Sequence, residues 1–263
     1  MATGRSINKY ARVYVDGFDL SGHARTIGPL SSIFQEGADD PMNAAIIGNL
    51  LGQATINPGT LNALFDNTAV TGIHSVLGTA GGQRTLMVAQ GIQAAPAKGD
   101  PVFAGQFRQS SYQSTPGDTP VALMVKFSPT SSAAATLQYT NPWGVLLHSN
   151  GAELAASTDS GVDQLAESTW GGYMVYEVLA AAGAGNITAT LKVQDSSTAN
   201  DGDFGDLLSS GVINCGAGGV YVPTFGVVAL GVTATVKQFV RWQVVLGTAT
   251  SVTFVLSFHR NYI

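Results

Sequence analysis

Apolar and polar side chains alternate along much of the second half of the chain, and this pattern restricts those segments to extended strands. Residues 187–194 place an apolar side chain at every second position, between threonine, lysine and glutamine. Residues 239–244 and 252–259 follow the same rule, with the short segment 247–251 between them. A period of two puts alternate side chains on opposite faces of a strand. We therefore predict three half-buried strands, the last two joined as a hairpin through residues 247–251.

The faces of the middle strand follow from the same alternation. Val240, Trp242 and Val244 share the apolar face, whereas Arg241 lies on the opposite face. We expect Val240→Asp to abolish soluble folding, because a buried unpaired carboxylate is costly by several kcal/mol. We expect Arg241→Ala to leave the fold intact and to weaken assembly, because an exposed arginine adds little to monomer stability but is enriched at interfaces.

The first half carries a similar signal in shorter runs. Residues 121–128 alternate in the same way, with valine, leucine and phenylalanine at every second position. Further strand-like runs occupy residues 12–15, 86–90, 102–107, 145–148 and 173–178. Many short strands separated by Gly-rich turns are typical of a sandwich or barrel. We predict a mainly β fold, an antiparallel β-sandwich or barrel.

One segment favours a helix that flanks the strands. Thr60 is a suitable N-cap, and Gly78 would end the helix. The apolar residues at helical spacing between them are Leu61, Leu64, Phe65, Ile73, Val76 and Leu77. Gly72 weakens the middle, so one short helix followed by a turn is the alternative. The pattern also allows a second helix from Pro41 through Leu51, but a strand through the same residues fits the pattern almost as well.

Composition suggests extensive contact with other subunits and a division near residue 130. Only 11% of the 263 residues are charged, against about 25% in an average protein. A Ser/Ala/Thr-rich stretch, residues 128–142, lies where the charge balance of the chain changes. Residues 1–130 hold eight basic and eight acidic side chains, whereas residues 131–263 hold four basic and nine acidic side chains. We predict a β domain with a flanking helix over 1–130 and an acidic β-sandwich-like half over 131–263. The two halves could also form one continuous unit.

Several classes of protein are excluded by what the sequence lacks. Cys215 is the one cysteine, so an internal disulfide framework and a cysteine-rich zinc module are impossible. The start of the chain lacks the apolar core of a signal peptide, and no apolar run reaches the roughly 20 residues that span a bilayer as a helix. Neither half has a basic stripe for tight nucleic-acid binding. We expect a protein made in the cytoplasm that does not enter a membrane.

No residues converge on a catalytic, cofactor or metal site. The sequence has four histidines, His23, His74, His148 and His259. They lack metal-binding spacing, and we interpret them as surface or packing residues. A Gly-x-Ser-x-Gly motif is missing, and the Gly-rich segments 78–83 and 215–219 lack the features of a phosphate loop. Cys215 has no partner base and is interpreted as a buried packing residue. We predict no enzyme activity, no catalytic residues, no cofactor and no metal.

Two features leave a binding role open. An acidic cluster within residues 195–207 contains Asp195, Asp201, Asp203 and Asp206. These carboxylates could offer oxygen ligands to calcium, but their spacing departs from a calcium loop, and a solvated hairpin loop is favoured. The tryptophans are Trp143, Trp170 and Trp242. They would form a sugar-binding platform if they shared an exposed face, although core packing is favoured for Trp242.

The order of segments along nearly the whole chain carries a resemblance. The segments are residues 11–22, 57–77, 99–107, 119–129, 141–151, 171–180, 186–198 and 236–261. They read as an opening strand, a small-residue loop and helix-like stretch, a strand after a Gly-Asp step, an alternating strand, and then the strands of the second half around an acidic loop. This arrangement resembles the tail tube (major tail) proteins of long-tailed bacteriophages and related prophage virion proteins.

The resemblance implies a structural virion protein. Such proteins are β-sandwiches or barrels with a flanking helix, and their copies form rings, usually hexameric, that stack around a tape-measure protein into a tube for DNA. It implies no catalytic residues. It also implies self-association, neighbouring tail proteins as partners, transient passage of DNA without specific binding, and a place in the virion tail after assembly in the bacterial host cytoplasm.

The length and the acidic excess refine this picture and leave alternatives. The chain is long for one tube domain, and it shows no internal repeat, so a hexamer with an added small C-terminal β-sandwich is favoured over a pseudo-hexameric trimer. The acidic excess would suit a channel that must not trap DNA. The alternatives are a capsid decoration or head–tail connector protein, and a carbohydrate-binding β-sandwich module.

One early segment is expected to make contacts between subunits. Residues 35–57 begin with charged residues and continue into an apolar run with no clear commitment to helix or strand. A long loop with exposed apolar residues is unlikely to stay in solvent in a working assembly. We predict that this segment is loosely packed in the monomer and becomes ordered between subunits. Burial of its apolar side chains would have to offset the ordering entropy of roughly 1–2 kcal/mol per residue.

Overall fold

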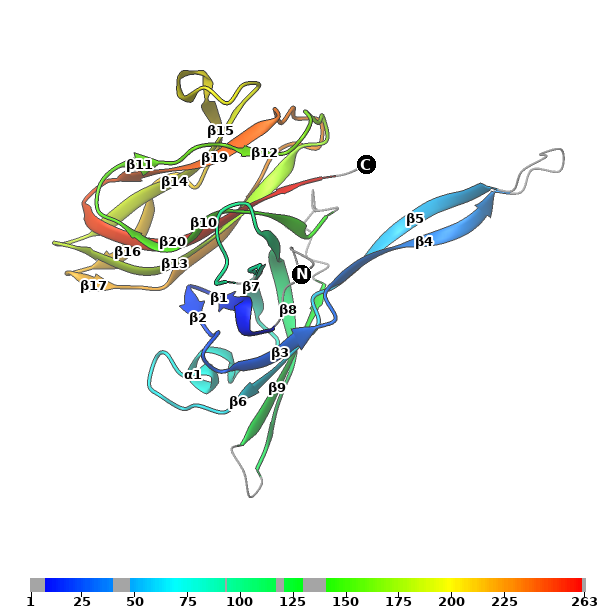
Figure 1. Ribbon diagram of the computed structural model, residues 1–263. Coiled ribbons are helices and arrows are strands. Elements are labelled where there is room, and N and C mark those ends of the chain that lie inside the picture. Colours follow the sequence, from blue (N-terminus) through cyan, green and yellow to red (C-terminus); the bar gives the residue numbers. More distant parts are fainter. Residues whose placement is uncertain (1–7, 40–47, 93, 117–120, 130–140, 262–263) are drawn as a thin grey trace.

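The computed structural model describes residues 8–39, 48–92, 94–116, 121–129 and 141–261. Within these residues, the chain forms an 11-stranded sheet, a 7-stranded sheet and a two-stranded hairpin (Figure 1). The ladders are antiparallel, and α1 (Ile73–Leu77) is the one α-helix of the described part. The predicted mainly β, antiparallel fold with a single helix is confirmed.

The 11-stranded sheet runs through both halves of the chain. Its main path has the order β18-β13-β20-β10-β8-β7-β1-β2, and β9, β6 and β3 branch from β8. Because β10 pairs with both β8 and β20, the sheet continues from the first half into the second. The strands are β1 (Ala11–Val15), β2 (Phe18–Asp19), β3 (Ala24–Gly28), β6 (Thr60–Leu64), β7 (Gln83–Gln90), β8 (Pro101–Thr115), β9 (Ala122–Pro129), β10 (Trp143–Glu153), β13 (Gly172–Gly183), β18 (Thr224–Ala229) and β20 (Ala249–Arg260).

The 7-stranded sheet packs on the second half of the large sheet and forms a sandwich with it. Its path is β11-β19-β14-β16-β17, with β12 on β19 and β15 on β14. Val240, Trp242 and Val244 of β19 face Val252 and Phe254 of β20 in the core, so the predicted inward face is confirmed. The strands are β11 (Ser157–Thr158), β12 (Val162–Asp163), β14 (Ile187–Ser196), β15 (Gly205–Ser209), β16 (Ile213–Ala217), β17 (Val220–Tyr221) and β19 (Phe239–Leu246). The 3-10 turns are η1 (Asn8–Tyr10) and η3 (Asp201–Asp203).

Two further apolar clusters organise the first half and its junction with the second. In the first half, strands curl around Leu86, Phe103 and Leu123, and α1 adds Ile73. The other cluster lies on the opposite face of the large sheet and combines Tyr14 and Met87 of the first half with Tyr173 and Val255 of the second. The two halves therefore share a core, in addition to a sheet. β20 is also buried on both faces, whereas the alternation had predicted a half-buried strand.

Three sequence predictions are corrected by tertiary structure. Residues Thr60–Leu64 form β6 instead of a helix, because β6 is held between β3 and β9 with Leu61 and Ala63 buried and Asn62 exposed. The segment 247–251 does not close a hairpin, because β19 belongs to the small sheet and β20 to the large one. The chain instead crosses between the two layers of the sandwich there.

Arg241 is the third correction. It lies on the face of β19 opposite Val240, as predicted, but its side chain is 7% exposed. Its Nε donates to Gln194 Oε1 at 2.9 Å, its Nη1 contacts Asp201 at 3.0 Å, and its guanidinium lies 4.1 Å from the centre of the Phe204 ring. The loop after β14 folds over the strand and covers this side chain.

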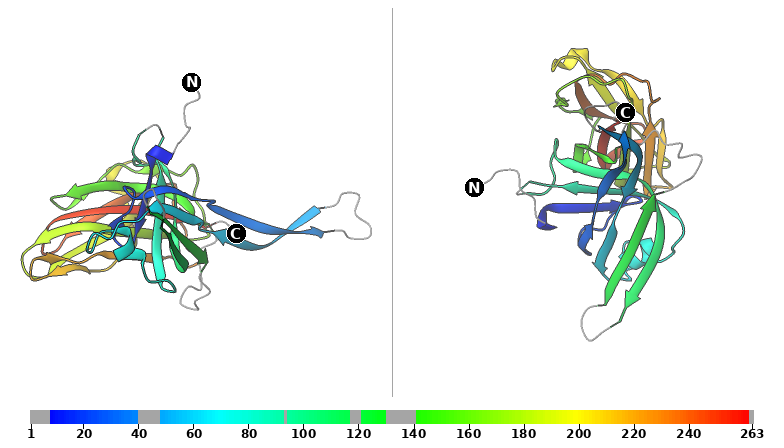
Figure 2. Two further views of the ribbon diagram at one scale, coloured as in Figure 1. Left: turned by 90° about the horizontal axis from the view of Figure 1, so that it is seen from below. Right: turned by 90° about the vertical axis from the view of Figure 1, so that its right-hand side faces the viewer.

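A two-stranded arm projects far from the body of the molecule (Figures 1 and 2). It consists of β4 (Ser31–Asp39) and β5 (Gly48–Asn57) and connects β3 to β6. The possible helix over Pro41–Leu51 falls partly on residues 40–47, which lie outside the described residues. The part that is described, from Gly48 on, is a strand, so the strand alternative holds there.

Candidate assembly surface

A four-stranded antiparallel sheet at the base of the arm presents an open outer face. It has the order β3-β6-β9-β8, with only the far end of β8 taking part. Thr26 lies opposite Asn62, and Asn62 lies opposite Met124, so these exposed side chains share the outer face. The inner face carries Leu61, Leu123 and their neighbours in the first-half core. The sheet is therefore apolar inside and mostly polar outside.

The charge on this outer face is positive. Lys126 follows Met124 by two residues, and Arg108 lies opposite Ser128, so both cations project from the same face. Both are exposed, and among the described residues neither side chain has an ion-pair partner. The four strands contain no aspartate or glutamate. The face can therefore approach an anionic surface without carboxylate repulsion.

Both edges of this sheet are open within the described part of the chain. β3 pairs with β6 and with no other described strand. At the other side, the ladder between β7 and β8 ends at Arg108, and residues 111–115 of β8 pair with β9 alone. An unpaired strand edge presents free N–H and C=O groups that can pair with another chain. The sheet can thus be extended by a neighbour at each side.

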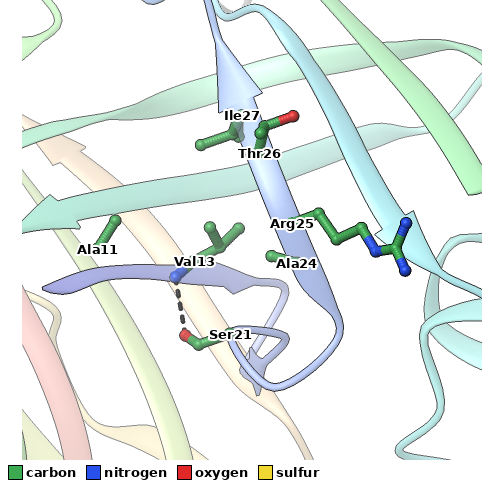
Figure 3. A pocket seen from close by; sticks show the side chains of 7 residues that line it. All are labelled: Ala11, Val13, Ser21, Ala24, Arg25, Thr26 and Ile27. Carbon is green, nitrogen blue, oxygen red and sulfur yellow. Dashed lines mark hydrogen bonds between the residues drawn. The ribbon is translucent and has the colours of Figure 1, made fainter. Parts of the chain in front are cut away.

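A small pocket lies between β1 and β3 (Figure 3). The lining residues are Ala11, Val13, Ser21, Ala24, Arg25, Thr26 and Ile27. Ser21 Oγ accepts the Val13 N–H at 2.9 Å, which satisfies the backbone of β1 at this point. Arg25 is the one charged residue of the lining, and Figure 3 shows its side chain extending from β3 away from Val13. Within the described residues, β1 and β3 do not pair with each other across this pocket.

The arm leaves the body directly from this sheet. Its ladder runs from Ser31 opposite Asn57 to Asp39 opposite Gly48, with an irregularity after Phe34. Ile33 near its base is 61% exposed. A hairpin of two strands without a third strand is marginally stable in water. Among the described strands, β4 and β5 pair only with each other, so each has one backbone edge that a further strand can pair with.

The acidic cluster within residues 195–207 lies on a hairpin loop, and its carboxylates contact neighbouring strands. β14 and β15 pair on either side of it, which confirms the hairpin interpretation. Asp195 accepts the Lys237 N–H at 2.9 Å, Asp201 contacts Arg241, and Asp206 contacts Lys192 at 2.5 Å. Within the described residues, no three His, Cys, Asp or Glu side chains are grouped so as to hold a metal ion. Hydrogen bonds from Thr198 and Asn200 lower the pKa of the Asp203 carboxyl.

The tryptophans occupy three different environments. Trp242 packs edge-on against His148 and Phe254 in the sandwich core, as favoured from the sequence. Trp143 packs against Phe103 in the first-half core, with ring centres 5.3 Å apart. Trp170 is 47% exposed. The three rings therefore do not form a shared platform.

The histidines are placed largely as packing residues. His148 Nδ1 lies 3.0 Å from the Phe254 carbonyl oxygen, and the His148 ring stacks on the Phe254 ring. Burial lowers the pKa of His148. His74 is tilted against Phe65 and lies 2.5 Å from the Tyr112 hydroxyl. His23 lies 3.6 Å from Asp66. None of these contacts joins one histidine to another.

Ser257 and His259 lie within hydrogen-bond distance of each other, at 2.9 Å, a pair that the sequence did not suggest. Both side chains are 0% exposed, and the His259 ring stacks on Tyr173. Burial lowers the pKa of His259 to about 3. A nucleophile and base enclosed in this way contact the core and no solvent, and we interpret the pair as packing. Cys215 is buried in the sandwich as predicted, and burial raises the pKa of its thiol to about 11.

The open sheet edges had no clear signal in the sequence. The strand pattern around Lys126 predicts an exposed face, but pairing partners depend on residues far apart in the chain, such as those of β3 and β6. The helical spacing in residues 61–64 also concealed one strand of this sheet. The absence of acidic residues from its strands is the one feature that inspection of the sequence could have found.

Comparison with known proteins adds little. No protein-family model matches the sequence, and no curated protein is significantly similar to it. A search of solved structures finds the SPP1 Dit protein, described as "a paradigm of hub adsorption apparatus in Gram-positive infecting phages". The match covers 96% of this chain and 99% of that one, with 10% sequence identity and a TM-score of 0.28. The superposition is too loose to carry an inference about fold or function. Among the described residues, no helix has the length and hydropathy needed to cross a membrane.

Proposed function

We propose that the chain is a structural component of a bacteriophage tail and that its copies associate into rings as tail tube proteins do. The observation that carries the proposal is the sheet β3-β6-β9-β8, which has one open edge on each side. The order of segments in the sequence and the low content of charged residues, 11%, support it. The general part of the proposal is that the chain is a tail protein. The specific part is that it forms the tail tube.

The two open edges are different surfaces, and this difference favours a ring. If β3 of one copy pairs with the far end of β8 of the next, the contact is heterologous, or head-to-tail. Repeated heterologous contacts close into a ring when the rotation allows it. The four-stranded sheets would then join into one continuous wall, and closure would leave no exposed edge. Six copies are favoured over three because the sequence shows no internal repeat.

In such a ring the outer face of the sheet lines the channel. By register its side chains are mostly polar, with Leu64, Ala122 and Met124 as the apolar ones and Lys126 and Arg108 as the cations. Few cations per copy give a weak attraction for phosphates that rises at low salt. The acidic excess of residues 131–263 lies in the other half of the chain, so in this arrangement it does not line the channel. Passage of DNA without tight binding agrees with this distribution.

The arm is the contact to a neighbouring copy or to the adjacent ring. It starts at the edge of the proposed wall and extends away from the body (Figure 2). Pairing with a third strand would stabilise a hairpin that is marginal alone. Ordering of this segment on assembly, as predicted from the sequence, remains a proposal.

Cysteine cross-linking tests the head-to-tail contact. The variant carrying both Thr26→Cys and Gln113→Cys places one thiol on each open edge, and the native Cys215 is buried. A short bifunctional thiol reagent should give a ladder of covalent oligomers that ends at the copy number of the ring. The variant pairing Thr26→Cys with Val212→Cys is the control, because Val212 is 78% exposed and far along the chain from either edge. Equal ladders from both variants, or none from the first, would contradict the edge-to-edge contact.

A further inference from the structure

The turn between β1 and β2 fits into a seat formed by the second half of the chain. Asp16 and Gly17 have φ values of 51° and 82°, the left-handed pair that a two-residue type I′ turn requires. A Cβ on Gly17 would lie 2.9 Å from the Val178 carbonyl oxygen and 3.0 Å from Pro223 Cβ. Only glycine therefore allows the turn to approach β13 and the start of β18 this closely. The Tyr221 hydroxyl also donates to the Val178 carbonyl beside the turn.

Glu177 lies at the base of this seat. Its side chain is 0% exposed, Oε2 accepts the Gly17 N–H, and Oε1 has no hydrogen-bond partner among the described residues. The packing of β13 between β18 and β20 leaves this carboxyl no direct path to solvent. One carboxyl group of the second half is thus in direct contact with the backbone of the first.

The charged and titratable groups around Glu177 do not compensate a negative charge. Asp16 approaches from the turn, Tyr176 belongs to β13 itself, and Tyr221 approaches from β17. Arg84 of β7 is engaged by Asp16, at 2.9 Å, and no described cation forms an ion pair with Glu177. Burial, and secondarily the Asp16 charge, raise the pKa of Glu177 well above its usual value. An ionised carboxylate in this place would be buried without a cation beside it and with only the backbone N–H groups of Gly17 and Asp16 as donors, which is costly.

We propose that Glu177 is a proton-controlled latch that holds the β1–β2 turn of the first half in the second half. While Glu177 is neutral, the turn stays seated. Ionisation of Glu177 requires water, and the turn leaves its seat to admit it. The latch acts within one chain, so it does not depend on ring formation.

Hydrogen exchange of the purified single chain tests the latch. Exchange in the peptide spanning residues 14–21 is compared at about pH 6 and about pH 9, after correction for the intrinsic pH effect on exchange. Between the ordinary pKa of an exposed glutamate and the raised pKa of seated Glu177, opening linked to one proton grows about tenfold per pH unit, and it levels off above the raised pKa. Residues 239–246 in the sandwich core are the internal reference and should show no such increase.

Two glutamine variants separate the latch from general effects of charge. Glu177→Gln keeps the shape and the acceptor for the Gly17 N–H but cannot ionise, so opening of the turn should lose its pH dependence. Glu167→Gln is the control, because Glu167 is exposed and should leave the profile of the native chain unchanged. Turn exchange in the native chain that is independent of pH, or an unaltered profile in Glu177→Gln, would overturn the proposal. If Glu177→Gln does not fold, the proposal is decided by the pH dependence of exchange in residues 14–21 of the native chain, compared with that in residues 239–246.

Discussion

At the scale of single residues, His259 makes stability depend on pH. Its pKa is about 3 in the folded state, because the ring is fully buried against Tyr173, and about 6.5 when unfolded. Between these values the unfolded chain binds a proton that the folded chain does not bind. The contribution of His259 to stability is therefore complete above about pH 6.5 and falls by several kcal/mol as the pH is lowered toward 3. Urea unfolding at about pH 7.5 and about pH 4.5 measures the net change, to which protonation of buried Glu177 contributes in the opposite direction, so the His259 contribution is the difference from a variant without this histidine.

A substitution separates His259 from the other acid-sensitive groups. His259→Gln should lower stability at neutral pH through imperfect packing, yet lose less stability on acidification than the native chain. The loss does not disappear, because the pKa of buried His148 is also lowered. The same acid sensitivity in the native chain and in His259→Gln would assign the effect to other residues.

The contacts of Arg241 change the prediction made from the sequence. Arg241→Ala is now expected to cost about 1–3 kcal/mol of monomer stability, because Gln194 and Asp201 lose a charged hydrogen-bond donor. Lys237→Ala is the control, since this lysine is 43% exposed and lies 3.9 Å from Asp195. Its effect should stay below about 1 kcal/mol. Urea midpoints for the two variants should differ accordingly, and similar midpoints would show that the buried network adds little.

At the scale of elements, the sequence predicted strands well where one face is buried and the other is exposed to solvent. β9, β14 and β19 alternate clearly, and each was expected within a few residues of its observed bounds. β20 alternates too, but cores on both sides bury both of its faces, which a period of two cannot reveal. β6 was missed because Leu61 and Leu64 suit a helix, while pairing with β3 and β9 is a long-range effect.

The arm is the element whose removal should separate folding from assembly. Deleting Gly37–Gly52 takes away the outer part of the arm, Gly37–Asp39 of β4 and Gly48–Gly52 of β5, and none of the described residues in the three apolar clusters. We expect the melting temperature of the monomer to change by less than about 3 °C and ring formation to be lost. Calorimetry and size-exclusion chromatography measure the two effects. A large fall in melting temperature would place the arm in the folding core, and unaltered assembly would remove it from the subunit contacts.

At the scale of the whole molecule, the sheet and the third apolar cluster tie the two halves together. Residues 1–130 alone would expose Tyr14, Met87 and Val102, which pack against Tyr173 and Val255 in the complete chain. We expect this fragment to be insoluble or molten, with weak near-ultraviolet circular dichroism and strong dye binding. A soluble fragment with a cooperative unfolding transition would show that the first half is an independent domain.

The sequence left it open whether the halves form one unit and could not decide it. The change of composition near residue 130 is real, yet the strands that flank it, β9 and β10, both pair with β8. Such pairing joins residues far apart in the chain, and local composition carries no record of it. The candidate assembly surface was hidden for the same reason, although the predicted contact role of residues 35–57 pointed to the neighbouring arm.

Electron cryomicroscopy of the purified, concentrated protein tests ring formation most directly. The proposal predicts closed rings, alone or stacked, in which β3 of each copy continues the sheet of the next copy at β8 and the face with Lys126 and Arg108 lines the channel. The arms should reach from each copy to a neighbour. Single particles of monomer size at all concentrations, or rings whose contacts leave both edges of this sheet free, would contradict it.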